Sequence, residues 1–147
     1  DNFELVVQKA TELGVTTIVP IILERSEKKN LNGDRLHKIA TEASEQCFRG
    51  DIPFISDIVR LTDALHTLQT GDESMYFHMD GVDMRDASIQ EKIKSGAGIN
   101  LFIGPEGGWS DSEIDQFKEN GITSVSLGKT VLRAETAAIT ACAFTCI

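Results

Sequence analysis

The chain has 147 residues, of which 41% are hydrophobic and 25% charged, a composition typical of one soluble globular domain with a core of its own. No apolar run approaches the roughly 20 residues of a membrane span, and the three cysteines lack the spacing of a disulfide framework. The formal net charge of −9 argues by itself against a nucleic-acid binder, because phosphate contacts need lysine and arginine. The chain starts at Asp1 without a signal-peptide pattern, so we expect it to be a piece of a longer protein.

Hydrophobic periodicity predicts alternating helices and strands from the start of the chain. Apolar residues from Phe3 to Leu13 recur at the helical period, and Gly14 can end that helix. Thr17 to Leu23 is a β-branched run that predicts a buried strand, although Pro20 indicates an edge position or a bulge. A clearly amphipathic helix is predicted from Asp34 to Phe48.

The middle of the chain carries shorter predicted elements. Phe54-Ile55 predicts a short strand, and Thr62 is expected to be the N-cap of a short helix. Met75 to Met79 is a strand candidate that a polar turn follows at Asp80-Gly81. A weaker helix is predicted from Asp86 to Lys94.

The last third of the chain has the strongest signals. Ile99 to Ile103 is an apolar run between glycines and predicts a strand. The capping box Ser110-Asp111-Ser112-Glu113 opens a helix that runs to about Asn120. A short strand around Val125 and a buried helix from Ala134 to Cys146 follow. This alternation predicts an α/β domain with a mostly parallel sheet flanked by helices.

Two irregular stretches, each after a predicted strand, carry the main functional signal. They are Gly104-Pro105-Glu106-Gly107-Gly108 and the residues from Leu127 to Thr136. Glycine-rich turns leave backbone groups uncovered, and open α/β sheets bind ligands at the carboxyl ends of their strands. The first stretch matches neither a dinucleotide-binding nor a Walker motif. Together the stretches predict a main-chain-lined pocket for a small cofactor, with an ordinary strand-to-helix turn as the alternative.

Single side chains near these stretches admit two interpretations each. Arg133 could hold a substrate oxygen or form an exposed ion pair with Glu135. His78 ends a predicted strand, where a lone histidine is more often structural than ligand-binding. Phe102 and Trp109 are more often core residues, although an aromatic ring beside such a turn can cover an adenine ring.

Positive charge gathers in one short part of this acidic chain. It predicts either a local basic patch or an ordinary solvated surface. Cys142 and Cys146 would share one helix face, as small core residues rather than metal ligands, because no Cys/His cluster completes a site. The basic residues are Arg25, Lys28, Lys29, Arg35, Lys38 and Arg49.

Taken together, the motifs resemble the RsmE family, the 16S ribosomal RNA uridine-N3 methyltransferases of the SPOUT superfamily. The resemblance covers nearly the whole chain, so residues 1–147 are expected to be one SPOUT methyltransferase domain. The sequence departs from the family at Phe48, near a usual glycine, and at Thr130, where a basic residue is frequent. The resembling segments are 8–15, 24–26, 42–46, 104–110, 127–128 and 132–137.

The resemblance implies a fold, a cofactor and partners. The fold would be the α/β domain with a deep trefoil knot near its C-terminus, which is rare among proteins. The cofactor would be S-adenosylmethionine, bound bent in the knot, and the substrate the ribosomal RNA of the small subunit. The active unit would be a cytoplasmic homodimer without membrane or metal partners. The family also carries an N-terminal PUA-like RNA-binding domain, which is absent from these 147 residues.

The resemblance also assigns roles to residues. Arg133 would stabilise charge on the uridine, while Glu106 or Glu135 accepts the N3 proton or orients Arg133. The six basic residues above would hold RNA phosphates. Two other functions stay open: a knotted methyltransferase that acts on a ribose 2′-oxygen or a guanine, and a non-catalytic dimeric RNA-binding module. The implied cofactor-binding residues are His78, Phe102, Ile103, Gly104, Glu106, Gly107, Gly108, Leu127, Gly128, Leu132, Arg133 and Thr136.

Overall fold

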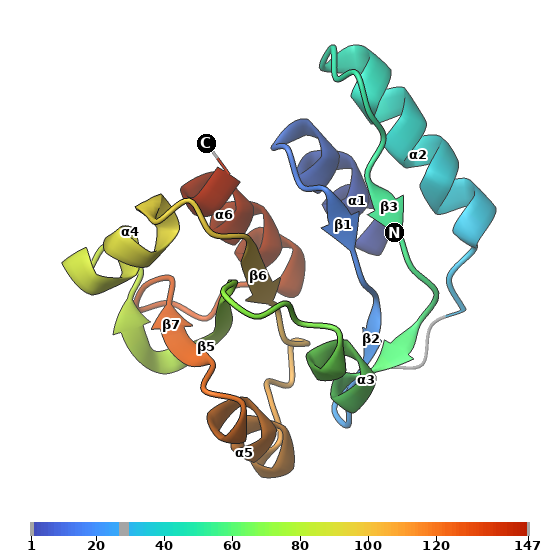
Figure 1. The fold of residues 1–147 in the computed structure, drawn as a ribbon. Helices are drawn as coiled ribbons and strands as arrows, with labels where there is room; N and C mark the ends of the chain where they lie inside the picture. Colours follow the sequence, from blue (N-terminus) through green and yellow to red (C-terminus); the bar gives the residue numbers. More distant parts are fainter. Residues whose placement is uncertain (1, 27–29, 147) are drawn as a thin grey trace.

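A computed structural model describes residues 2–26 and 30–146 of the chain. These residues fold into an α/β domain whose short strands pair in small sheets, with helices around them (Figure 1). Every strand pairing described is parallel. The parallel α/β architecture predicted from the sequence is therefore confirmed. Within the described residues, no helix is both long and apolar enough to cross a membrane.

The N-terminal half contains two small sheets, one pairing β1 with β3 and the other β2 with β4. The single strand predicted from Thr17 to Leu23 is wrong in one respect, because it is interrupted at Val19-Pro20 and forms β1 and β2. Proline has no N–H to donate to a ladder, but the Pro20 carbonyl accepts a 3.0 Å hydrogen bond from the Val59 N–H. The elements are α1 (Asn2–Glu12), β1 (Thr17–Ile18), β2 (Ile21–Ile22), α2 (Gly33–Gln46), β3 (Phe54–Ile55), β4 (Val59–Arg60) and α3 (Leu61–His66).

Two further details of this half differ from the sequence predictions. Helix α3 begins two residues earlier than expected, with Arg60 rather than Thr62 in the N-cap position. The Thr62 hydroxyl instead forms a 3.0 Å hydrogen bond with the Gln116 side chain, in the helix α5 (Asp111–Glu119). Strand β4 has only two residues, too few for a periodic signal. Beyond the end of α2, Phe48 adopts φ 60°, the left-handed region in which a glycine is unstrained.

The C-terminal half contains a three-stranded sheet in the order β6-β5-β7. The polar turn predicted at Asp80-Gly81 is wrong, because both residues lie inside the long strand β5. There the pairing register with β7 shifts, so that Phe77 and Val82 both pair with Val125, which marks a bulge. The elements are β5 (Glu73–Asp83), α4 (Ala87–Lys94), β6 (Ile99–Phe102), α5 (Asp111–Glu119), β7 (Thr123–Ser126) and α6 (Ala134–Cys146).

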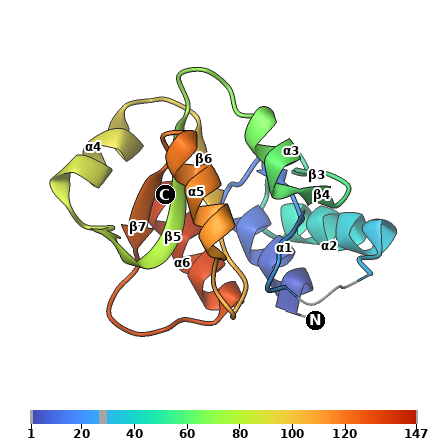
Figure 2. The same ribbon diagram turned by 90° about the horizontal axis from the view of Figure 1, so that it is seen from below.

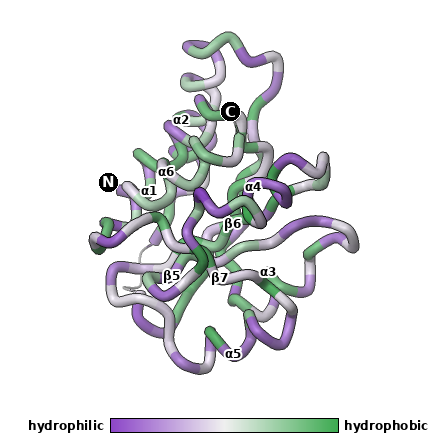
Figure 3. Tube along the Cα trace, turned by 90° about the vertical axis from the view of Figure 1, so that its left-hand side faces the viewer, coloured by the Kyte–Doolittle hydropathy of each residue, from purple (hydrophilic) through white to green (hydrophobic). Residues whose placement is uncertain are grey.

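Clusters of buried apolar residues lie on both faces of this central sheet. Figure 3 shows the Cα trace coloured by the hydropathy of each residue. Tyr76 points to the face covered by α3 and α5, where its ring stacks on Phe117 at 4.4 Å between centroids. Its neighbours Met75 and Phe77 point to the opposite face, toward α4 and α6, as the two-residue period of a strand requires. Helices α1 and α2 form a third cluster with β1, and α1 packs against α6 (Figure 2).

The cysteine pair on α6 only partly follows its prediction. Cys142 packs at the edge of the third cluster, as a small core residue would. Cys146 is exposed, so its predicted core position is wrong. In residues 2–26 and 30–146 no group of three or more His, Cys, Asp and Glu side chains is arranged to hold a metal ion.

Candidate functional site

A pocket of about 280 Å³ opens where β6 and β7 end, beside the bulge of β5. Residues from three parts of the chain line it, namely 77–79, 103–109, and 126–128 with 130–132, together with Ala134 and Ala137 of α6. The two irregular stretches that we singled out from the sequence therefore form two walls of one pocket. Its position past the carboxyl ends of parallel strands is where open α/β sheets bind ligands.

Most of the predicted cofactor-binding residues line this pocket, and three do not. Phe102 is buried in the core instead, with its ring 5.2 Å from that of Phe117. Arg133 and Thr136 lie exposed at the start of α6, outside the lining. The predicted residues that line the pocket are His78, Ile103, Gly104, Glu106, Gly107, Gly108, Leu127, Gly128 and Leu132.

The glycine wall owes its shape to local backbone geometry. Gly108 has φ +78°, and its N–H donates a 2.9 Å hydrogen bond to the Pro105 carbonyl, which closes a tight turn. Gly128 on the opposite wall has φ +137°. Residues with side chains are strained in both conformations, which explains the glycines.

Trp109 supports this wall from behind. Its indole N–H donates a 2.9 Å hydrogen bond to the Phe77 carbonyl, and the edge of its ring meets Phe117. Only 4% of Trp109 is exposed. A Cβ atom on Gly104 would lie 2.9 Å from the indole ring, so a side chain there is excluded by contact. Trp109 is thus chiefly a core residue that positions the wall, although part of it lines the pocket.

The charges around the pocket are few. Among the described residues that line it, His78 and Glu106 are the ionisable ones, and none is Lys or Arg. His78 Nδ1 accepts a 3.2 Å hydrogen bond from the Asp80 N–H, so a neutral ring carries its proton on Nε2. A lining without basic side chains suits a neutral or positively charged ligand better than an anion.

The three predicted catalytic residues surround the mouth of the pocket. Glu106 lines it and is exposed, whereas Arg133 and Glu135 sit at the start of α6 outside the lining. Within the described part of the chain, the side chains of these three residues form neither hydrogen bonds nor ion pairs. They are therefore free to turn toward a bound molecule.

The four predicted RNA-binding residues that the structure describes each contact a different partner within the domain. Arg35 pairs with Glu4 and lowers the pKa of that carboxyl, and Lys38 lies 3.9 Å from Glu42. Arg25 donates to backbone carbonyls of the glycine wall. Lys28 and Lys29 lie outside the described residues.

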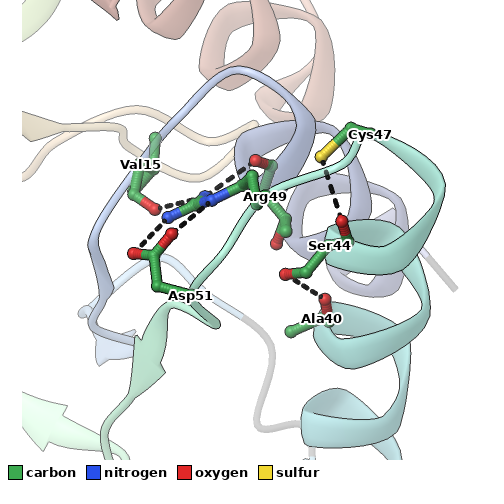
Figure 4. A network of polar contacts seen from close by, with 7 residues as sticks. Val15, Ala40, Ser44, Cys47, Arg49 and Asp51 are labelled. Carbon is green, nitrogen blue, oxygen red and sulfur yellow. Dashed lines mark hydrogen bonds and ion pairs between the residues drawn. The ribbon is translucent and has the colours of Figure 1, made fainter.

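Arg49 is the most enclosed of these basic residues, with 13% of its side chain exposed. Its Nη1 donates to the carbonyls of Thr11 at 2.8 Å and Val15 at 3.0 Å (Figure 4). Nε and Nη2 hold both oxygens of Asp51 and keep the pKa of that carboxyl below its usual value. These contacts tie α1, the turn after it and the end of α2 together. The number of basic residues in a segment does not show which carbonyl or carboxylate groups they contact, so the sequence analysis did not identify these partners of Arg49.

Parallel strands that end in a pocket walled by glycines and main chain define an α/β cofactor-binding domain. A family model described as "RNA methyltransferase domain" matches residues 1–145, and the chain belongs to that family. Over 146 residues it is 34% identical to ribosomal RNA small subunit methyltransferase E of Rickettsia conorii, covering 97% of this chain and 58% of that protein. Over 143 residues it is 36% identical to the protein of the same name from Aquifex aeolicus, covering 94% and 59%. The resemblance to the RsmE family is thereby confirmed.

Two solved structures are also similar. One is a putative methyltransferase from Legionella pneumophila in complex with bound S-adenosylmethionine, with a TM-score of 0.84 and 35% identity. The other is ribosomal RNA small subunit methyltransferase E from Neisseria gonorrhoeae bound to S-adenosylmethionine, with a TM-score of 0.83 and 31% identity. Each match covers 97% of this chain and 59% of the other. The chain thus spans less than two thirds of the length of these relatives.

Proposed function

We propose that the chain is the catalytic domain of an enzyme that transfers a methyl group from S-adenosylmethionine to N3 of a uridine in small-subunit ribosomal RNA. The observation that carries this proposal is the pocket between residues 103–109 and 126–132. Two similar proteins, 31% and 35% identical, are solved with S-adenosylmethionine bound. The name that the curated relatives share supports small-subunit ribosomal RNA as the substrate, and the uridine N3 acceptor is what the resemblance to the RsmE family implies.

The lining of the pocket fits S-adenosylmethionine chemically. Ile103, Leu127 and Leu132 offer an apolar slot for an adenine ring, beside backbone groups that glycine leaves uncovered. The cofactor supplies a methyl group on a positively charged sulfur. None of the described lining residues is basic, and Glu106 adds a negative charge that suits a cationic ligand.

The side chains at the pocket mouth supply the remaining chemistry. Arg133 turns toward the uridine and stabilises the negative charge that develops on its oxygens as N3 loses a proton. Glu106 accepts that proton or orients Arg133, and its place in the lining favours it over Glu135. The target base reaches this site only when it is splayed out of the RNA stack. Arg35 and Lys38, exposed on α2, are the described residues best placed to meet RNA phosphates.

A second copy of the chain completes the proposed enzyme. Helix α6 consists mainly of Ala, Thr and Cys with one Ile and one Phe, and its apolar residues are spread around the helix, yet only Ala138 and Ala141 are buried. A helix that is apolar all round belongs in an interior, which a homodimer interface over α6 supplies. Replacing Phe144, which is 44% exposed, with Asp is then expected to give monomers in sedimentation equilibrium. Dimers of unchanged affinity would contradict this interface.

Other features of the proposal rest on the family resemblance. They are a SPOUT domain over residues 1–147 with its C-terminal segment threaded as a trefoil knot, a cytoplasmic location, and RNA binding assisted by a PUA-like domain. The pocket at the strand ends, with its two adjoining walls, supports the SPOUT domain among these features.

Calorimetric titration with S-adenosylmethionine tests the core of the proposal. We expect saturable binding of one cofactor per chain, lost when Leu127→Arg places a cation in the pocket. The matched variant Ile58→Arg, on a partly exposed site outside this pocket, should bind like the wild type. Absence of binding at millimolar cofactor would favour a non-catalytic RNA-binding module. Mass spectrometry of methylated RNA then separates uridine N3 from a ribose 2′-oxygen or a guanine.

A further inference from the structure

Arg25 lies next to the glycine wall although 82 residues separate it from Gly107 in the sequence. Its Nη1 donates to the Gly107 carbonyl at 3.1 Å and to the Trp109 carbonyl at 3.2 Å. Both carbonyls belong to the irregular stretch between β6 and α5, where neither a strand ladder nor a helix takes them. A single guanidinium therefore fixes two peptide groups of the wall.

The backbone that carries Arg25 is itself firmly held. The Leu23 side chain is buried in the core, and its N–H donates a 3.0 Å hydrogen bond to the Ser26 hydroxyl. The Glu24 N–H donates a 3.1 Å hydrogen bond to Glu113 Oε2. Glu113 is 4% exposed and completes the capping box of α5 with Ser110. The turn after β2 is thus joined to the helix that follows the glycine wall.

The packing between the two segments is close as well. A Cβ atom on Gly107 would lie 3.2 Å from Arg25 Cβ and 3.5 Å from the Arg25 carbonyl. A side chain at position 107 would force Arg25 to move by a few tenths of an ångström, away from the position in which it reaches both carbonyls. The glycine at 107 therefore serves the contact with Arg25, in addition to leaving the pocket open.

We propose that Arg25 is a positioning residue, which holds the Gly104–Trp109 wall in the shape that binds the cofactor, rather than a contact for RNA phosphate. The inference rests on the function proposed above. A wall ordered before the ligand arrives loses less conformational entropy on binding, so fixing its two carbonyls raises cofactor affinity. Arg25 acts through the wall and does not itself line the pocket.

Cofactor affinity of Arg25 variants provides the test. Loss of these charge-assisted hydrogen bonds in Arg25→Ala is expected to raise the Kd for S-adenosylmethionine about tenfold. Arg25→Lys, which keeps the charge but not the planar fork, should recover part of the loss. The control Arg60→Ala removes an exposed arginine whose side chain has no hydrogen bond in the described part of the chain, and should leave the Kd unchanged.

Two further measurements separate positioning from general stability and from RNA contact. Without cofactor, the unfolding midpoint of Arg25→Ala should stay near that of the wild type. Saturating cofactor should raise the midpoint of the variant by less than it raises that of the wild type. In a double-mutant cycle with Gly107→Ala, the two effects on Kd should be less than additive, because both changes disturb one contact.

The opposing outcomes are distinct. An unchanged Kd in Arg25→Ala, with a salt-dependence slope for poly(U) binding that falls by about one, would make Arg25 a phosphate contact and overturn the inference. An unfolding midpoint of Arg25→Ala that falls below that of the wild type by the same amount with and without cofactor would also overturn the inference. Failure of the wild-type chain to bind S-adenosylmethionine would instead remove the proposed function, and the inference with it.

Discussion

Replacing Gly104 with Ala tests how tightly the core supports the pocket. The new Cβ would lie 2.9 Å from the indole Cε2 of Trp109 and 3.2 Å from its Nε1. Trp109 cannot turn aside freely, because its N–H holds the Phe77 carbonyl and its ring is packed edge-on against Phe117. Gly104 has an ordinary backbone conformation, so the expected cost is one of overpacking alone.

The magnitude follows from general values for such cores. Inserting one methyl group into a packed site that yields little costs about 2 kcal/mol. With about 2.1 cal/mol/K of unfolding entropy per residue, a chain of this length loses about 3 °C of midpoint for each kcal/mol. We therefore expect Gly104→Ala to lower the thermal midpoint by about 6 °C.

The assay is intrinsic fluorescence during thermal unfolding, because Trp109 is the only tryptophan of the chain. The native emission of the variant should shift as the indole is displaced, and its midpoint should fall. Gly33→Ala is the matched control, since a Cβ there meets no atom within 4 Å and the residue opens α2. A Gly104→Ala midpoint equal to those of the wild type and the control would refute the packing argument.

Three other predictions concern charged side chains. Arg133→Ala should lower methyl transfer at least a hundredfold while cofactor Kd and dimer affinity stay unchanged, as a radiolabel assay would show; unaltered turnover would remove its proposed role. Arg49→Ala should lower the unfolding free energy by about 2 kcal/mol because the Thr11 and Val15 carbonyls each lose a charge-assisted hydrogen bond, whereas intact stability with weaker RNA binding would restore Arg49 as an RNA contact. The hydrogen bond from Arg85 lowers the pKa of the Asp83 carboxyl to about 2, below the usual 3.8. The pair therefore stabilises the fold at pH values above 3.8, and this stabilisation is lost as the pH falls from about 4 toward about 2. An NMR titration of the Asp83 carboxyl should find that pKa, and Arg85→Ala should raise it; an ordinary value in the wild type would contradict the pairing.

Local patterns in the sequence were sufficient for the helices and for the pocket walls. The helix predicted from Asp34 to Phe48 is α2, Gly33–Gln46, because its apolar stripe has to face a core. The capping box at Ser110 starts α5 as predicted, since its hydrogen bonds join residues three apart. The glycine stretches line one pocket because each follows a strand of the same parallel sheet.

Contacts between residues far apart in the chain could not be predicted in the same way. The bulge of β5 depends on Gly81, where a Cβ would lie 2.5 Å from the Val125 backbone, a neighbour that only strand pairing supplies. Arg25 and Arg49 looked like parts of one basic patch, yet each binds carbonyls from another segment. Charge along a chain shows where a guanidinium is, but not which acceptor the fold brings to it.

The sequence by itself determined where backbone is left open for a ligand, because glycine conformations and strand ends are local properties. The tertiary structure decided which side chains reach that ligand and which support the wall around it. It placed Glu106 in the lining, Arg133 and Glu135 at the mouth, and Arg25 behind the glycine turn. These assignments depend on packing between the two halves of the domain, which a periodic or charged pattern does not encode.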